Sequence, residues 1–281
     1  METEYYWSEA LKRTSIAIKN GALVPLSTEL SIISSKLGEE FELRKLIREA
    51  PTSVNSLGPR PNPFSPWDPR LEVSLIGKEH VLILNKYPVQ QGHMLLITRE
   101  WAPQHGWLSY MDFQALVTVN NDTKGLWFFN SGPAAGASQP HRHLQLLRRK
   151  KDELFCPSQR WLESLLEQST DKFTKLANSC AAKTLSAKNN AEILLQKYLE
   201  IADIIGLGNP IDNTYPRQAY NLLISNDLIV IIRRKQEGIA GFSVNALGFA
   251  GYLLSTEISD LAWLYNHGPE ALLEAVVERV Q

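Results

Sequence analysis

The sequence predicts an α+β fold with one mainly antiparallel β-sheet and helices around it. Short runs rich in Val, Ile, Leu and aromatic residues recur in pairs with turn residues between them, which is typical of antiparallel hairpins. Apolar residues at helical spacing mark three other parts of the chain, at residues 4–19, 110–122 and 158–205. A glycine-rich loop near the middle of the chain leads into a run that carries two histidines.

The composition fits one elaborated globular domain. The chain has 281 residues, 44% of them hydrophobic, enough for a large core. Its formal net charge of -1 gives no overall field to gather nucleic acid or anionic membrane, and we expect neither as a partner. Cys156 and Cys180 form no Cys-x-x-Cys pair, which argues against a disulfide framework or a thiolate zinc site. With no signal peptide pattern and no apolar run of about 18 residues, we expect a cytoplasmic protein.

The N-terminal part, residues 1–54, is expected to add a helix and a strand to the core. Residues 4–19 place apolar side chains on or near one face, and Asn20-Gly21 would end that helix. Residues 40–47 alternate as in a strand.

A proline-rich connector follows at residues 51–69. Prolines fix φ and remove amide donors, so this segment is stiff and belongs to neither a helix nor a central strand. It carries Phe64 and Trp67. Two interpretations stay open: a structural strap across the surface, or a lip of the functional site.

Residues 55–150 are expected to form the core of the sheet. Its first three strands are predicted at 71–76, 80–84 and 94–98 and should form an antiparallel meander, because Gly77-Lys78-Glu79 suits a hairpin turn. A helix is then predicted over residues 110–122, with Ser109 as its N-cap.

The glycine loop lies inside a predicted hairpin at the sheet centre. Residues 126–129 read as a buried strand, residues 132–138 as the loop, and residues 141–148 as the second strand. Side chains two apart on a strand share a face, so His141, His143 and Gln145 should stand in a row.

Such a row suits attack on phosphorus. An imidazole is largely neutral at pH 7 and needs no separate base, so it can take up a nucleotidyl group and pass it on. The amide of Gln145 can donate to a phosphoryl oxygen without adding charge. Backbone N–H groups of residues 132–138 and the Ser138 hydroxyl can meet the other oxygens. A two-histidine zinc site and a pair of structural histidines are the alternatives, although no further Cys or His lies at ligand spacing.

The remaining third is predicted as a helical segment, residues 151–215, and a C-terminal part, residues 216–281. Small and polar residues 181–190 read as a flexible link within the first. In the second, residues 219–224 and 228–232 flank a turn and form a hairpin. Two closing helices are expected to start at Ser255 or Thr256 and at Gly268-Pro269.

The run His141-Arg142-His143-Leu144-Gln145, preceded by Asn130 and by Gly136-Ala137-Ser138-Gln139-Pro140, resembles the His-x-His-x-Gln signature of the nucleotidyltransferase branch of the histidine-triad superfamily. Within that branch it is most similar to the ATP adenylyltransferases, or diadenosine tetraphosphate phosphorylases. The resemblance implies a histidine-triad-like fold and a covalent adenylyl intermediate on His143. It also implies that Gln145 supports this intermediate and that His141 holds the ring or a phosphate oxygen.

Substrate contacts are implied in the same way. Segment 85–95 resembles the superfamily's Asn-x-x-Pro-x-x-x-Gly-His stretch, so Asn85 should bind ribose and Lys86 could reach polyphosphate, while His93 is expected to be structural. Arg60 would contact phosphate. Other implied contacts to phosphate or to the second nucleotide are Asn130, Gly136, Ala137, Ser138, Gln139, Ser243 and Asn245.

The implied substrates are diadenosine tetraphosphate, ATP, ADP, AMP and phosphate, with Mg²⁺ on the polyphosphate and no zinc. A monomer is expected. A hexose-1-phosphate uridylyltransferase is an alternative, but those enzymes often carry metal-binding cysteines that this chain lacks. A dinucleoside polyphosphate hydrolase would have His where Gln145 stands. A nucleotide-binding sensor without catalysis is the alternative of another class.

Overall fold

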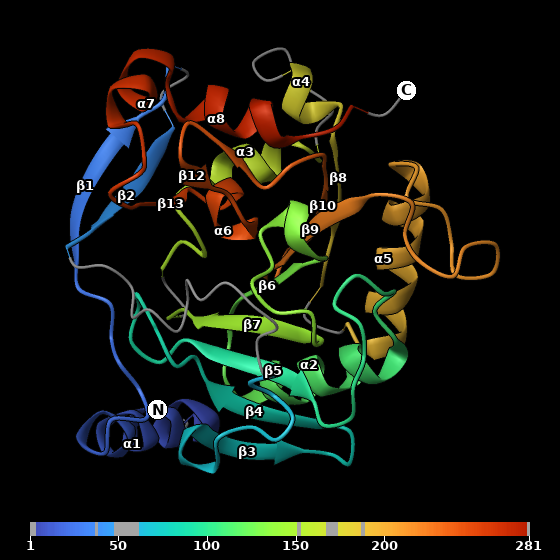
Figure 1. Ribbon diagram of the computed structural model, residues 1–281. Coiled ribbons are helices and arrows are strands. Elements are labelled where there is room, and N and C mark those ends of the chain that lie inside the picture. The colour runs from blue at the N-terminus through green and yellow to red at the C-terminus, as the bar shows by residue number, and fades with distance from the viewer. Residues whose placement is uncertain are drawn as a thin grey trace.

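One antiparallel sheet organises the molecule (Figure 1). The computed structural model describes residues 4–36, 39–47, 62–150, 153–166, 174–186 and 189–279. In spatial order the strands of the sheet are β3 (Glu72–Ile76), β4 (His80–Leu84), β5 (Met94–Thr98), β7 (His143–Arg148), β6 (Gly125–Asn130), β9 (Ala219–Ile224), β10 (Leu228–Arg234) and β8 (Cys180–Thr184). Every neighbouring pair is antiparallel, so the predicted fold class is confirmed.

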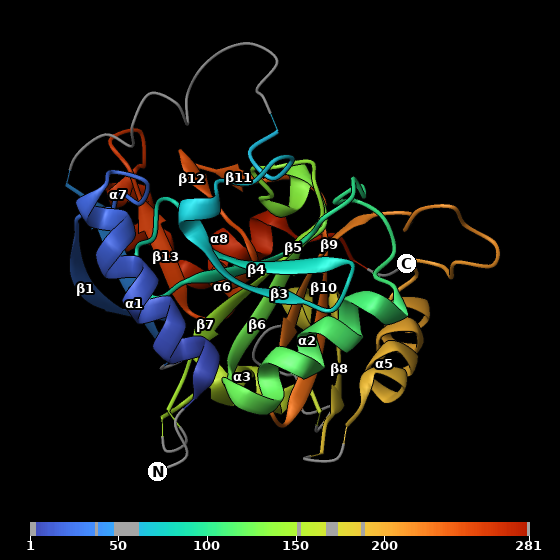
Figure 2. The ribbon, with the colours of Figure 1, turned by 90° about the horizontal axis from the view of Figure 1, so that it is seen from below.

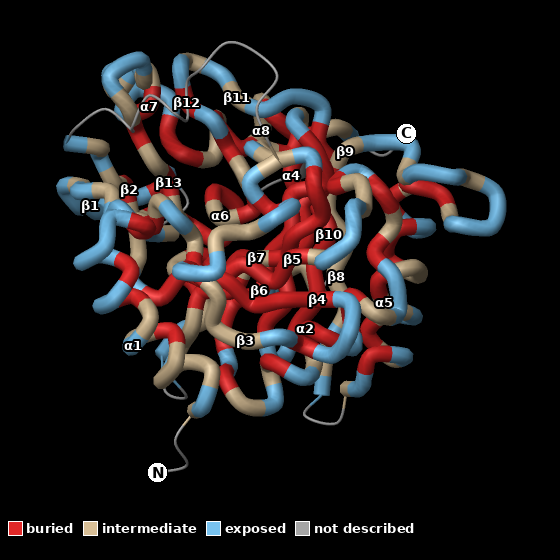
Figure 3. The backbone as a smooth tube through the Cα atoms, turned by 60° about the horizontal axis from the view of Figure 1, so that its bottom comes forward, coloured by how far each residue is buried: buried red, intermediate tan, exposed pale blue. Residues whose placement is uncertain are grey.

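Helices cover both faces of this sheet (Figure 2). One apolar cluster joins the sheet to α1 (Tyr5–Lys19), α2 (Tyr110–Asp122) and α5 (Ala191–Ile204). The other joins it to α3 (Gln159–Ser164), α4 (Thr174–Ala177), α6 (Ala246–Phe249), α7 (Leu261–His267) and α8 (Pro269–Val276). The central strands are therefore buried on both faces, as the red core of Figure 3 shows. No helix in the described ranges combines the length and apolar character needed to cross a membrane.

Smaller elements complete the second layer. A three-stranded sheet contains β1 (Thr28–Ser34), β2 (Glu40–Leu46) and β13 (Tyr252–Ser255), and a short ribbon contains β11 (Gly238–Ile239) and β12 (Phe242–Ser243). Two 3₁₀ turns, η2 (Pro69–Leu71) and η3 (Pro133–Ala135), precede β3 and follow β6.

Most predicted elements are confirmed. The helix over 4–19 ends at Asn20, and the helix over 110–122 begins with a capping box between Ser109 and Asp112. The meander of β3, β4 and β5, the central hairpin of β6 and β7, and the hairpin of β9 and β10 all form. In each of these elements, the turn or cap residues and the apolar pattern predict the same structure.

Three predictions are wrong. Residues 180–184 of the expected helical segment and link form β8, because their small side chains pair with β10 at the sheet edge and tertiary pairing outweighs weak propensity. Residues 252–255 form β13 beside β2, so the next helix starts only at Leu261, where the Asp260 side chain caps it. Strand β7 begins at His143, since His141 takes part only in an isolated bridge with Pro103.

Candidate active site

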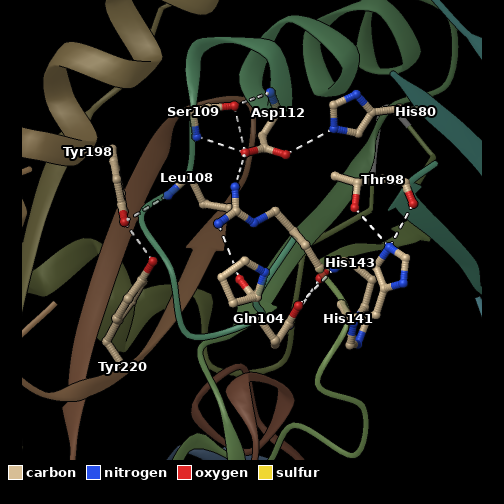
Figure 4. Close-up of polar contacts among 12 residues, drawn as sticks. His80, Thr98, Gln104, Leu108, Ser109, Asp112, His141, His143, Tyr198 and Tyr220 are labelled. Atoms are coloured by element: carbon tan, nitrogen blue, oxygen red, sulfur yellow. Dashed lines mark hydrogen bonds and ion pairs between the residues drawn. The ribbon is translucent and has the colours of Figure 1, made fainter. Parts of the chain in front are cut away.

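The side chain of Gln104 fixes the start of β7 against the end of β6. It is buried, and its Oε1 accepts a hydrogen bond from the backbone N–H of His143 at 2.8 Å. Its Nε2 donates to the carbonyls of Asn130 and His143, at 2.8 and 3.2 Å. Figure 4 shows this amide facing the His143 backbone. One side chain therefore sets the position of His143 relative to the loop that follows Asn130.

The His143 imidazole is buried and neutral. Only 4% of the residue is exposed, and Nδ1 lies 2.8 Å from the carbonyl oxygen of His141. A carbonyl can only accept, so Nδ1 carries the proton and Nε2 keeps its lone pair. Burial lowers the pKa of His143 to about 4, which leaves the ring uncharged at neutral pH. This is the protonation state that a nitrogen nucleophile requires.

His141, in contrast, has both ring nitrogens engaged. Nε2 donates to the carbonyl oxygen of Thr98 at 2.8 Å, and Nδ1 accepts from Nδ2 of Asn62 at 2.8 Å. Phe64 packs edge-on against both histidine rings, with centroid distances of 5.8 Å to His141 and 5.3 Å to His143. Within the described residues, only His143 of this pair has a ring nitrogen without a hydrogen bond. The geometry therefore favours His143 as the nucleophile.

Gln145 is oriented by a chain of hydrogen bonds through His93. Nδ2 of Asn85 donates to Nδ1 of His93 at 3.1 Å, and Nε2 of His93 donates to Oε1 of Gln145 at 3.0 Å. Burial lowers the pKa of His93 to about 4, so the neutral ring can accept at one nitrogen and donate at the other. The expected structural role of His93 is confirmed, and it leaves the Gln145 NH₂ group to donate elsewhere.

The glycine loop turns tightly and touches the C-terminal part of the chain. Gly132 and Gly136 have φ values of +110° and +80°, a region that glycine enters without steric cost. A Cβ on Gly136 would lie 2.7 Å from the carbonyl oxygen of Val244 and 2.8 Å from the Cβ of Asn245. Glycine at this position therefore allows the two segments to pack in direct contact.

The loop's own hydrogen bonds decide which donors can meet a phosphate. The amides of Gly136 and Ala137 donate to carbonyls within the loop, at 2.8 and 3.0 Å. The amides of Ser138 and Gln139 have no hydrogen-bond partner among the described residues, and both side chains are at least partly accessible. The sequence predicts several backbone N–H donors in residues 132–138. Four of them, those of Gly132, Ala135, Gly136 and Ala137, donate to carbonyls of residues 130–133, so fewer are available to a phosphate.

A buried polar network supports the loop from below. Oδ1 of Asn130 accepts from Nδ2 of Asn221 at 2.8 Å and from the backbone N–H of Ala246 at 2.9 Å. Asn221 also donates to the carbonyl of Ala135 and accepts from the guanidinium of Arg234. Burial lowers the pKa of Arg234 to about 9, so it remains a cation at neutral pH. Asn130 therefore supports the loop, and its Oδ1 already accepts two hydrogen bonds from the protein.

The other predicted substrate contacts are spread around this centre. Lys86 is exposed beside Asn85. Ser243 is exposed and its hydroxyl donates to Glu237 at 2.6 Å, while Asn245 caps α6. Arg60 lies outside the described residues. The substrate-binding roles of all four remain predictions.

The opposite side of β7 carries an ion pair. Arg142, between the two histidines in sequence, donates from Nη1 to Oδ2 of Asp112 at 3.0 Å, and His80 meets Oδ1 of the same carboxylate at 2.9 Å (Figure 4). Burial alone would raise the pKa of Asp112, but the His80 hydrogen bond and the Arg142 charge outweigh it and lower that pKa. The first turn of α2 is thereby tied to the catalytic strand.

Sequence reasoning missed several supporting residues. Those that hold the histidines or the loop are Asn62, Thr98, Gln104, Asp112, Asn221 and Arg234. One signal was present: Asn62 and Phe64 lie in the described end of the proline-rich connector, and their contacts to the histidine rings favour the interpretation of that end as a lip of the site. Strand alternation also puts Arg142 opposite the histidines, which predicts a buried partner there.

Comparisons with known proteins agree with this geometry. Residues 1–163 match the model of the Ap4A phosphorylase N-terminal domain, and residues 171–278 match that of the ATP adenylyltransferase C-terminal domain. Protein APA1 of Saccharomyces cerevisiae is 26% identical over 226 residues, 72% of this chain and 68% of that protein. Diadenosine 5',5'''-P1,P4-tetraphosphate phosphorylase 2 of the same yeast is 35% identical over 119 residues, 37% of this chain and 36% of that protein.

Solved structures show the same fold. The crystal structure of yeast Ap4A phosphorylase Apa2 superposes with a TM-score of 0.75 at 21% identity, covering 99% of this chain and 96% of that one. The structure of the same enzyme in complex with Ap4A gives a TM-score of 0.72 at 21% identity, covering 98% and 96%.

Proposed function

The chain belongs to the family of the Ap4A phosphorylase N-terminal domain, and we propose that it is a nucleotidyltransferase that cleaves diadenosine tetraphosphate with inorganic phosphate to give ATP and ADP. The observation that carries this proposal is the buried, neutral His143 with an unpaired Nε2, next to an amide whose orientation is fixed. The same site can run the reverse reaction, in which ADP adenylylates His143 with loss of phosphate, and ATP then accepts the adenylyl group to give diadenosine tetraphosphate.

In the first step, Nε2 of His143 attacks the α-phosphorus of the substrate. A nitrogen–phosphorus bond forms, the phosphorus–oxygen bond to the leaving ATP breaks, and the ring becomes cationic because Nδ1 keeps its proton. The carbonyl of His141, 2.8 Å from Nδ1, then faces a positive charge and holds it more strongly than in the free enzyme. The backbone of one histidine therefore stabilises the intermediate on the other.

In the second step, an oxygen of inorganic phosphate attacks the same phosphorus. The nitrogen–phosphorus bond breaks, ADP leaves, and His143 returns to its neutral state. The NH₂ group of Gln145 and the free amides of Ser138 and Gln139 can donate to the phosphoryl oxygens in both steps without moving a proton. The NH₂ group of Gln145 can only donate a hydrogen bond, so it cannot remove a proton from an attacking water. This supports phosphate as the acceptor.

Mg²⁺ is part of the proposal as a partner of the polyphosphate. Within the described residues no three His, Cys, Asp or Glu side chains gather at metal-binding distance. Phosphate oxygens and water would therefore supply most of the ligands, as Mg²⁺ commonly accepts. Measuring the rate against free Mg²⁺ at constant nucleotide tests this part.

A monomer is proposed as the working form. This proposal rests on the partners that His141, His143 and Gln145 already have within the chain, Asn62, the His141 carbonyl and His93, which leave no role at these side chains for a second copy. Light scattering coupled to size-exclusion chromatography, run at assay concentration, tests this directly.

The function is tested by asking which acceptor the enzyme needs. Purified protein is mixed with diadenosine tetraphosphate and radiolabelled phosphate, and products are separated by ion exchange. We expect equal amounts of ATP and ADP, with the label in the β-phosphate of ADP. Formation of AMP without phosphate would instead identify a hydrolase, dependence on a hexose phosphate a uridylyltransferase, and binding without turnover a sensor.

A further inference from the structure

An exposed tryptophan lies next to the catalytic histidines. Trp101 has 57% of its surface exposed, yet its ring lies 5.4 Å from the ring of His141, at 70°. Its neighbours hold it there: the carbonyl of Ala102 accepts from the N–H of Arg142 at 2.8 Å, and Pro103 bridges to His141. Single exposed apolar residues are common, but this one is fixed at the edge of the site.

The row of functional side chains has two different ends. At one end, Gln145 accepts a hydrogen bond from His93 at 3.0 Å, and His93 accepts one from Asn85 at 3.1 Å. At the other end stands Trp101, beyond His141. His143 lies between His141 and Gln145 in this row, two residues from each. Trp101, against His141, and Asn85, linked to Gln145, therefore lie at opposite ends of the row.

A dinucleoside polyphosphate has a base at each end and needs a surface for each. The transferred nucleotide must remain bound through both steps, and the predicted ribose contact of Asn85 assigns it to the Gln145 end of the row. The leaving nucleotide must depart after the first step, which suits an exposed aromatic surface that binds by stacking. Resting on the proposed function, we propose that Trp101 stacks with the purine of the leaving nucleotide and so selects a substrate with a second base.

The test compares a substrate that has the second base with one that lacks it. Diadenosine tetraphosphate loses ATP on attack by His143, whereas adenosine 5'-tetraphosphate loses tripolyphosphate. In Trp101→Ala, kcat/KM for diadenosine tetraphosphate should fall about tenfold, because stacking on one aromatic ring contributes about that factor. For adenosine 5'-tetraphosphate it should stay within about twofold. Trp101→Phe should keep most of the activity with both.

Tyr265→Ala is the matched control, since Tyr265 is an equally exposed aromatic residue, 60%, on α7. It should leave both substrates unaffected. Inhibition gives a second measurement: Trp101→Ala should weaken inhibition by ATP and leave inhibition by tripolyphosphate unchanged.

Three results would overturn the inference. Equal losses for the two substrates would place Trp101 against the transferred nucleotide or in a structural role. No loss for either would remove it from binding. If the unaltered protein turns over neither substrate, the proposed function itself fails, and this inference with it.

Discussion

The two sides of the run 141–145, at the start of β7, differ in charge. On the reactive side, His141, His143 and Gln145 are neutral and are held by neutral partners. On the other side, Arg142 forms an ion pair with Asp112 inside the protein. Strand alternation keeps the two apart, so the anchor can be ionic while the nucleophile stays uncharged. The Arg142 charge also contributes to a lowered pKa of His141, after burial.

Replacing the nucleophile on the reactive side should cause the largest loss of activity. His143→Asn keeps a side chain of similar shape that can still donate to the His141 carbonyl. We expect phosphorolysis to fall by at least about 10⁴-fold, because among the described residues no other imidazole of this row has a ring nitrogen without a hydrogen bond. The assay is product formation under saturating substrate, with circular dichroism as the control for folding. Residual activity within about a hundredfold of the unaltered enzyme would contradict the assignment.

Removing the oriented amide should cost less. Gln145→Ala is expected to lower kcat about 10²-fold, the usual effect of one lost donor to a phosphoryl or oxyanion group. His93→Ala should cause a similar loss, since His93 acts through Gln145. A double-mutant cycle measures this: the double variant should be little worse than either single one. Additive losses would mean that the two residues act separately.

A substitution on the ionic side should lower the stability of the fold. Asp112→Asn leaves the buried Arg142 without its counter-ion, and we expect a loss of about 3–5 kcal/mol in the free energy of unfolding. Urea denaturation measures this loss. Activity per folded molecule should change by less than about tenfold, because β7 remains clamped by Gln104. If Asp112→Asn keeps the midpoint of the urea transition but loses activity, Asp112 acts in catalysis and not in stability, which would contradict this prediction.

Lowering the pH should affect the reactive side, because it protonates His143. Since the pKa of His143 is lowered to about 4, kcat/KM should stay level from neutral pH to about pH 5 and fall only below it. In the unfolded chain the imidazole titrates near 6.5, so its contribution to stability is complete above that pH and is lost as pH falls toward 4. Between pH 7 and 5 the loss is about 2 kcal/mol. Urea unfolding at both values should show a smaller loss in His143→Asn.

Much of the fold followed from local patterns. Hairpins with clear turn residues, such as β9 and β10 around 225–227, and capped helices, such as α2 after Ser109, form as expected. Strands β8 and β13 could not be recognised, because their pairing with β10 and β2 depends on partners far away in sequence. Weak local preference leaves such segments to tertiary contacts.

The site likewise has parts that local patterns predict and parts that depend on contacts between distant segments. The row of His141, His143 and Gln145 comes from strand alternation within one short run, and it was accessible from sequence. Thr98 reaches His141 because β5 pairs with β7, and Gln104 reaches His143 because the chain after β5 folds back along residues 141–143. No local pattern encodes that path. The internal hydrogen bonds of the glycine loop follow no local pattern either, so the sequence could not predict which of its N–H groups stay available.

Label transfer tests the central claim most directly. The protein is incubated without phosphate with diadenosine tetraphosphate that carries ³²P in its α-phosphates, denatured and separated by gel electrophoresis. We predict one labelled band that survives base, is lost in acid as a phosphoramidate is, and is absent from His143→Asn. A label that persists in His143→Asn, or no label in an enzyme that still makes ATP and ADP, would contradict covalent catalysis by this residue.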